Sequence, residues 1–189
     1  EQMRTEELRP YYDALLQKRG ALAAKRVFDL VVSAVMLLLL SPVFLLLAVA
    51  IKLDSPGPVF FRQVRVTRYG ETFRIYKFRS MYLDAEDRLK DLMAQNEMQG
   101  LMFKMENDPR IIGSEKGPGK GIGNFIRQTS IDELPQFINV LKGDMSMIGP
   151  RPTLAKKPFS ECDPKTIKRY DVRPGITGYS QAYFRNSIT

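Results

Sequence analysis

The feature that most constrains this chain is a run without any charged residue from Leu30 to Ile51. Its length suits a helix that enters a lipid bilayer, and a helix that is apolar on every face is rarely found in a soluble domain. Ser41-Pro42 interrupts the run near its middle, where proline removes a helical hydrogen bond. Each half would measure roughly 15 Å, about half of the hydrocarbon thickness. We therefore expect a membrane helix that is broken at Ser41 and Pro42.

Basic residues flank the run on both sides. The positive-inside rule places such residues on the cytoplasmic face, and one straight span cannot put both ends there. A re-entrant helix that enters and leaves by the same face can do so; the alternative is a proline-kinked span with a weak charge bias. Asp29 at the entrance would need a partner, for which Arg26 is placed, unless it lies in interfacial water. The flanking residues are Lys18, Arg19, Lys25 and Arg26 before the run, and Lys52, Arg62, Arg65 and Arg68 after it.

The pattern on either side of this helix predicts a small mixed α/β domain. Apolar residues at helical spacing predict an amphipathic helix within residues 1–24. This helix would lie on the membrane surface, on the domain or on a second subunit, and the last case would make a homodimer. A β-hairpin is predicted over 59–66 and 72–78, a helix over 84–96 and a loop over 100–123. The expected organisation is thus an N-terminal helix (1–24), a re-entrant helix (25–54) and a cytoplasmic domain (55–189).

Charge and residue usage narrow the range of functions. A net charge of +8 favours phosphorylated molecules, an anionic membrane face or nucleic acid as partners. Basic and aromatic residues alternate in the predicted hairpin, as they do on RNA-binding sheets, but the adjacent apolar run favours a membrane-proximal phosphate site and no nucleic acid. The chain has no histidine and one cysteine, Cys162. Carboxylates, hydroxyls, lysine, arginine or a hard metal ion must therefore carry any catalysis.

The segment from Thr129 to Leu141 holds the most informative carboxylates, Asp132 and Glu133. Apolar residues at helical spacing and Gly143 at the end predict a helix here, with Pro135 in its first turn. The acidic pair would then lie at the helix N-terminus. The structural alternative is a capping box, in which residue 130 and Glu133 merely start the helix.

Two arginines after this helix have a backbone that suits phosphate binding. Arg151 lies between Pro150 and Pro152, and Arg173 begins the predicted tight turn 173–178. A rigidly held guanidinium can bind phosphate with two hydrogen bonds. The alternative is that both are solvated arginines in proline-rich turns.

Five motifs in one order make this chain resemble the monotopic phosphoglycosyl transferases, the bacterial sugar transferases that initiate exopolysaccharide and glycoconjugate assembly. The resemblance runs from about Lys25 to about Asn186. The five motifs are residues 76–81, 130–136, 141–146, 149–152 and 173–178, and the Ser41-Pro42 break precedes them.

The resemblance implies a reaction and a location. Asp132 would attack the β-phosphate of a UDP-sugar, UMP would leave, and polyprenyl phosphate would take the phosphosugar from the aspartate. Glu133, with Asp132, would hold Mg²⁺, which accepts one or two carboxylates together with phosphate oxygens. The protein would lie at the cytoplasmic face of the bacterial inner membrane. The cations expected to bind substrate phosphate are Lys77, Arg79, Arg127, Arg151 and Arg173.

The sequence also departs from the family pattern. Members usually continue well beyond the 173–178 motif, whereas this chain ends at Thr189, so a truncated C-terminus is expected. Residues 101–110 resemble exopolysaccharide-type members, which points to a hexose substrate. Two other hypotheses stay open: a catalytically inactive membrane scaffold that binds nucleotide or a partner, and a membrane-tethered nucleic-acid-binding protein, which would show steeply salt-dependent binding.

Overall fold

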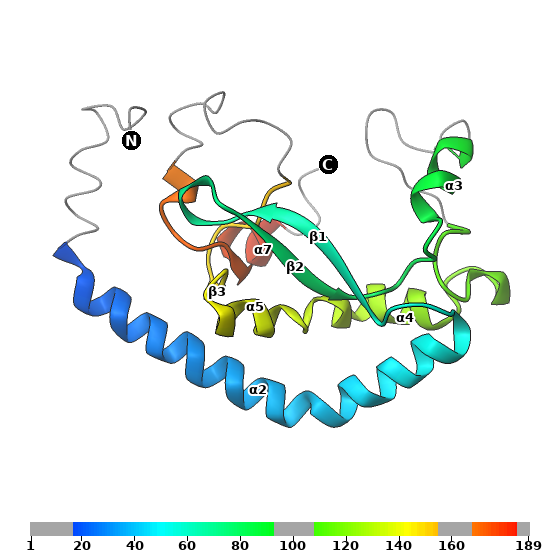
Figure 1. Cartoon of the computed structure of the whole chain (residues 1–189), viewed down its shortest axis with the longest axis horizontal. Coiled ribbons are helices and arrows are strands. Elements are labelled where there is room, and N and C mark those ends of the chain that lie inside the picture. Colours follow the sequence, from blue (N-terminus) through cyan, green and yellow to red (C-terminus); the bar gives the residue numbers. More distant parts are fainter. Residues whose placement is uncertain (1–16, 93–107, 155–167, 185–189) are drawn as a thin grey trace. The chain divides into compact units, whose positions relative to one another are not determined.

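The computed structural model describes residues 17–92, 108–154 and 168–184, and it confirms a mixed helical and β-sheet chain (Figure 1). The predicted N-terminal helix lies mostly outside the described residues. The chain divides into two compact units. The first unit comprises residues 1–39, 63–75 and 136–189, and the second comprises residues 40–62 and 76–135.

The longest element is helix α2, Arg19–Asp54, with Pro42 inside it (blue to cyan in Figure 1). It is long and apolar enough to cross a membrane. Most of its large apolar side chains are exposed, and Leu38, Leu46 and Leu53 are among the most exposed. A soluble protein would bury such a surface, so its exposure supports the predicted membrane contact. The helix continues through the predicted break at Ser41-Pro42, because the freed backbone groups of one residue can be accommodated within a long helix.

Each half of α2 contacts its own unit through a pair of residues at i and i+4, which lie on one helix face. In the first unit this pair is Asp29 and Ser33, and both are buried. In the second unit it is Leu47 and Ile51, which are also buried. One half therefore docks through polar groups and the other through apolar ones.

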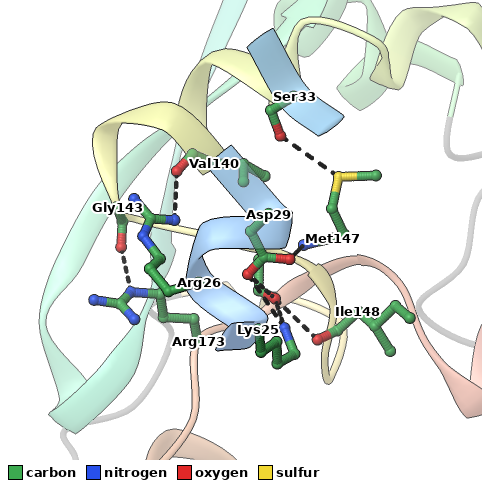
Figure 2. Close-up of polar contacts among 10 residues, drawn as sticks. Lys25, Arg26, Asp29, Ser33, Val140, Gly143, Met147, Ile148 and Arg173 are labelled. Carbon is green, nitrogen blue, oxygen red and sulfur yellow. Dashed lines mark hydrogen bonds and ion pairs between the residues drawn. The ribbon is translucent and has the colours of Figure 1, made fainter. Parts of the chain in front are cut away.

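In the first unit, Asp29 connects α2 to the strand β3, Ser146–Ile148 (Figure 2). Its carboxylate accepts hydrogen bonds from the Ser146 hydroxyl at 2.8 Å, the Met147 backbone N–H at 3.1 Å and Lys25 Nζ at 3.2 Å. Arg26 instead donates to the backbone carbonyl of Val140 at 2.8 Å. The prediction that Arg26 pairs with Asp29 was therefore wrong, because the neighbouring lysine occupies that position.

The first unit is completed by helix α5, Gln136–Lys142, and by two short parallel strands, β3 and β4, Gly175–Thr177. The predicted tight turn at 173–178 is thus partly a strand, paired in the register Ser146 to Gly175 and Ile148 to Thr177. The backbones approach so closely that a Cβ on Gly175 would collide with Gly149. The core consists of Phe73, Ile75, Val140 and Met145. The remaining elements are the 3₁₀ turns η2, Arg68–Gly70, and η7, Lys168–Tyr170, and helix α7, Tyr179–Phe184.

The predicted hairpin is confirmed as strands β1, Phe60–Val66, and β2, Thr72–Phe78, which pair in one sheet. In the second unit, Phe78 is the centre of the core. Its ring contacts Phe44 edge-on at 5.1 Å and stacks on Phe60 at 5.4 Å between centroids. Leu47, Ile51, Ile112 and Ile126 complete this core.

Three further elements of the second unit are helices α3, Ala85–Leu92, and α4, Ile122–Thr129, and the 3₁₀ turn η4, Ser114–Lys116. Helix α3 confirms the start of the helix predicted over 84–96. Helix α4 was not predicted as a separate element. Gly121 precedes α4 at φ 86°, and a Cβ there would collide with the Gly113 backbone. These glycines therefore allow two segments to pack directly against each other.

A buried ion pair in the second unit generates the first testable prediction. The Asp108 carboxylate accepts two bonds from the Arg110 side chain, at 2.9 and 2.7 Å. Burial alone would raise the pKa of Asp108, but hydrogen bonds and charge from Arg110 outweigh it and lower the pKa below its usual value. Asp108→Asn should therefore destabilise the protein at neutral pH by about 3 kcal/mol, because it removes a carboxylate that pairs with a buried guanidinium.

A depressed pKa contributes stability above the unfolded-state pKa and loses it as the pH falls through the folded-state value. The difference in unfolding free energy between parent and Asp108→Asn should accordingly shrink in acid, as measured by urea unfolding in detergent. The matched control is Asp84→Asn, since Asp84 and Arg88 form an exposed pair, for which less than about 1 kcal/mol is expected. Equal effects of the two substitutions would contradict the structural role of Asp108.

Candidate active site

The predicted acidic pair lies in a short 3₁₀ turn, η5, Ile131–Glu133, between helices α4 and α5. Helix α5 begins only at Gln136, so Asp132 and Glu133 precede the helix by about one turn instead of forming its first residues. Ser130 has φ 58° and makes no side-chain capping hydrogen bond. The structural alternative of a capping box is therefore not observed.

Lys77 on β2 contacts both carboxylates of this pair within the second unit. Its Nζ lies 3.2 Å from Asp132 Oδ2 and 2.9 Å from Glu133 Oε1. The three side chains are between 17% and 29% exposed, so they are held in place yet open to solvent on one side. Two carboxylates and one ammonium leave a local charge of about −1, which an anionic ligand would not approach without further cations.

The packing of the second unit explains why these three side chains converge. Successive residues of a strand point to opposite faces, and Phe78 is buried in the core at 1% exposure. Lys77 therefore points away from that core. The acidic turn is held by the same core, because Ile126 of α4 is fully buried in it and Ile131 of η5 packs against it. The left-handed conformation of Ser130, which is uncommon for residues other than glycine, turns the chain between them.

The other predicted phosphate-binding cations are placed differently. Arg79 is 3% exposed and donates to the Ser55 carbonyl at 2.7 Å and to the Pro56 carbonyl at 3.0 Å, so its guanidinium is engaged by the loop after α2. Arg127 is exposed on α4, and among the described residues no hydrogen bond joins it to the acidic pair. The structure thus brings Lys77, and not these two arginines, into contact with Asp132 and Glu133.

Arg151 and Arg173 belong to the first unit. Arg151 is exposed, and its carbonyl accepts a bond from Arg169 at 2.9 Å. Arg173 Nε donates to the Gly143 carbonyl at 2.7 Å (Figure 2). Burial, followed by the charges of Arg26 and Arg68, lowers the pKa of Arg173. The first unit therefore contains its own concentration of positive charge.

Sequence reasoning missed one contact of the site and one buried polar residue of the first unit. Lys77 was predicted to bind phosphate, but its direct contact with the carboxylates was not foreseen, because residues 55 apart in sequence give no local signal. Asn139, which is fully buried, was not singled out; its Nδ2 donates to the Arg74 carbonyl at 2.8 Å and to Asp144 Oδ2 at 3.1 Å. The apolar periodicity of 134–141 gave no signal for it, because Asn139 lies on the opposite side of the predicted helix.

The described residues combine a carboxylate pair held by a lysine with a long apolar helix whose surface is mostly exposed, as expected of a protein that contacts a membrane. Residues 20–189 match the model of the family described as bacterial sugar transferase, and the chain belongs to this family. The resemblance inferred from the five motifs is thereby confirmed.

Curated relatives agree with this assignment. The chain is 47% identical over 178 residues to "Galactosyl transferase CpsE" of Streptococcus agalactiae, an alignment that covers 94% of this chain and 37% of that protein. It is 40% identical to "Undecaprenyl-phosphate galactose phosphotransferase" of Salmonella typhimurium, with 92% and 35% covered. It is 39% identical to "Exopolysaccharide production protein PSS" of Rhizobium leguminosarum, with 85% and 74% covered. The chain therefore spans roughly a third of the first two relatives.

The lysine bridge generates a second prediction. In a double-mutant cycle, Lys77→Met and Glu133→Gln should show a coupling in unfolding free energy of about 0.5–1 kcal/mol, because both single changes remove the same partly exposed ion pair. The cycle is measured by urea unfolding in detergent. The matched control combines Glu133→Gln with Lys116→Met, since Lys116 pairs with Asp54 instead, and these effects should be additive. Additivity in both cycles would rule out the bridge.

Proposed function

We propose that this chain transfers a sugar phosphate from a UDP-sugar to polyprenyl phosphate, as an early membrane step in exopolysaccharide or glycoconjugate assembly. The observation that carries this proposal is the pair Asp132 and Glu133, held by Lys77 within a chain of the sugar transferase family. The names of the relatives support it, since the Salmonella protein is called an undecaprenyl-phosphate galactose phosphotransferase. The galactose in that name also fits a hexose donor.

In the proposed mechanism, a carboxylate oxygen of Asp132 attacks the β-phosphorus of the UDP-sugar. The bond between that phosphorus and the bridging oxygen breaks, and UMP leaves with the electron pair. An oxygen of polyprenyl phosphate then attacks the same phosphorus, and the bond to the aspartate breaks to give polyprenyl-diphospho-sugar. A carboxylate is a suitable covalent nucleophile for such a two-step exchange. Asp132 is the more enclosed of the two carboxylates, at 17% exposure against 29% for Glu133.

The donor set fits a magnesium ion. Adjacent carboxylates with one open side are what Mg²⁺ uses when it shares its coordination with substrate phosphates, and here Asp132 and Glu133 supply them. When bound, the ion would offset the negative charge of the carboxylates and of the diphosphate. Lys77 would keep both carboxylates oriented and would balance part of their charge. Arg127, Arg151 and Arg173 stay candidates for binding the phosphates of the substrates.

We further propose that α2 is re-entrant and that the domain lies at the cytoplasmic face of the bacterial inner membrane. The exposed apolar surface of both halves of α2 supports contact with lipid. Basic residues before and after the apolar run support placing both ends on one side. A site at that face could meet a soluble nucleotide sugar and a lipid acceptor together.

The reaction can be tested by UMP release from a panel of UDP-sugars with undecaprenyl phosphate and Mg²⁺ in lipid nanodiscs. Asp132→Asn should lower the rate by at least about a thousandfold, because it removes the attacking group. Glu133→Gln should lower the apparent Mg²⁺ affinity by about 10- to 100-fold, and chelation should abolish turnover. The control Asp84→Asn removes an exposed carboxylate of the same unit and should retain the parent rate.

Turnover by Asp132→Asn at the parent rate would contradict its role as nucleophile. If the parent releases no UMP from any donor but binds UDP-sugar, the inactive scaffold becomes the better description. Binding of DNA or RNA that falls steeply with salt, without turnover, would favour the nucleic-acid hypothesis.

Topology provides a separate test. Lys18→Cys and Lys52→Cys are made separately in a Cys162→Ser background. Each cysteine should react with a membrane-impermeant maleimide in inside-out vesicles, and neither should react when the reagent is added to intact cells. This result is expected because both ends of a re-entrant helix lie on the cytoplasmic side. Reaction of the two cysteines from opposite sides would show a kinked transmembrane span instead.

A further inference from the structure

A groove in the second unit is not used by the acidic site. It lies beside the start of β1 and has a volume of about 460 Å³, within the range of small-ligand sites. Its walls combine apolar and cationic side chains, and none of the residues that line it is acidic. The main lining residues are Val59, Phe60, Phe61 and Leu83, together with Arg62 and Arg79.

Arg79 gives this groove a buried positive charge. The guanidinium is bonded only to neutral oxygens, from Ser55 and Pro56. In the described parts of the chain no carboxylate pairs with it, and its Nε has no hydrogen-bond partner. Burial also lowers the pKa of Arg79, as expected for a charge that lies away from water. A buried cation without a counterion leaves a positive potential that favours an anion nearby.

Arg62 supplies a second cation, at the surface. Its guanidinium lies 5.2 Å from the centre of the Tyr76 ring, and its side chain is exposed. The ring orients the arginine without neutralising its charge. The hydrogen-bonding edges of a stacked guanidinium remain available, which suits recognition of a phosphate group.

The apolar walls of the groove are open. Phe61 is 43% exposed and Leu83 is 68% exposed, so side chains of the described residues leave both walls of the groove accessible. A molecule that satisfies both parts of the groove must have an anionic head and a hydrocarbon tail. In the same unit, α2 exposes Leu45, Leu46 and Leu53, so a ligand from the bilayer would have apolar surface at hand.

We propose that this groove binds the phosphate head and the first isoprene units of a polyprenyl phosphate, with Arg62 contacting the phosphate. The assignment rests on the proposed function, because that reaction supplies the chemical class of the acceptor. Arg79 is a positioning residue here: it holds the loop after α2 and adds positive potential to the groove. A groove of this volume takes one chain end, and the rest of the lipid would remain in the bilayer.

Photocrosslinking locates the ligand without requiring turnover. The full chain in nanodiscs is irradiated with an undecaprenyl-phosphate analogue that carries a diazirine on its first isoprene unit, and the labelled peptides are identified by mass spectrometry. Label within residues 58–62 or at Leu83 is expected. Undecaprenyl phosphate should reduce it, whereas undecaprenol should not. Label confined to α2, or equal displacement by phosphatidylglycerol, would overturn the proposal and indicate a general lipid surface.

Kinetics of matched variants test the cation. Arg62→Gln should raise the KM for undecaprenyl phosphate by about tenfold, as expected from loss of one charge-assisted hydrogen bond. Exchange of labelled UMP into UDP-sugar without lipid should be unchanged, because it does not involve the acceptor. The control Arg74→Gln removes an exposed arginine elsewhere on β2 and should leave both values unchanged. An unchanged KM for Arg62→Gln would overturn the assignment.

A second matched pair tests the apolar wall. Phe61→Ala should also raise the KM for undecaprenyl phosphate several-fold, whereas Phe125→Ala, at a similarly exposed phenylalanine of α4, should not. Failure of the proposed function remains distinguishable from failure of the groove. Absence of UMP release with persistent label at 58–62 would reject the reaction and keep the binding site. Normal turnover with label elsewhere would keep the proposed reaction and reject the groove as the binding site.

Discussion

The burial of the Asp29 carboxylate is the interaction on which the first unit depends. A helix that exposes apolar residues to lipid has few side chains left with which to attach itself to a polar domain. An apolar contact would compete poorly, because lipid offers the same environment. A carboxylate cannot be satisfied by lipid, and it has directional partners in Ser146, Met147 and Lys25. These directional hydrogen bonds therefore fix which residues of α2 face β3, in addition to holding the helix on the domain.

In the second unit, α2 is attached through aromatic side chains instead of charged ones. Phe44 of α2 packs edge-on against Phe78, the last residue of β2. Because strand residues alternate, the burial of Phe78 turns Lys77 to the opposite face of β2. Lys77 reaches the acidic turn, and Arg79 enters the loop after α2. The orientation of the candidate site thus follows from core packing next to it.

The sequence predicted those elements whose signals are local. The hairpin, the long apolar helix and the end of α5 at Gly143, with φ 94°, follow from periodicity and turn chemistry. Contacts between distant segments were not predictable in this way. Arg26 and Lys25 are both within reach of Asp29 on a helix, and only the position of β3 and α5 decides between them. Strand β4 was missed since its three residues pair with a partner far away in sequence, and α4 because glycines around it indicated a loop.

The Asp29 contact also has a consequence for the order of events during synthesis. Asp29 and Ser146 are separated by 117 residues. At about 5–20 residues per second, a ribosome makes the distant partner on the order of ten seconds after the aspartate. Throughout that delay the new helix can already meet the membrane, where an unpaired carboxylate is unfavourable. Lys25, one turn earlier on the same helix, is present from the start. Lys25 can therefore pair with the Asp29 carboxylate until Ser146 and Met147 have been synthesised and can bind it.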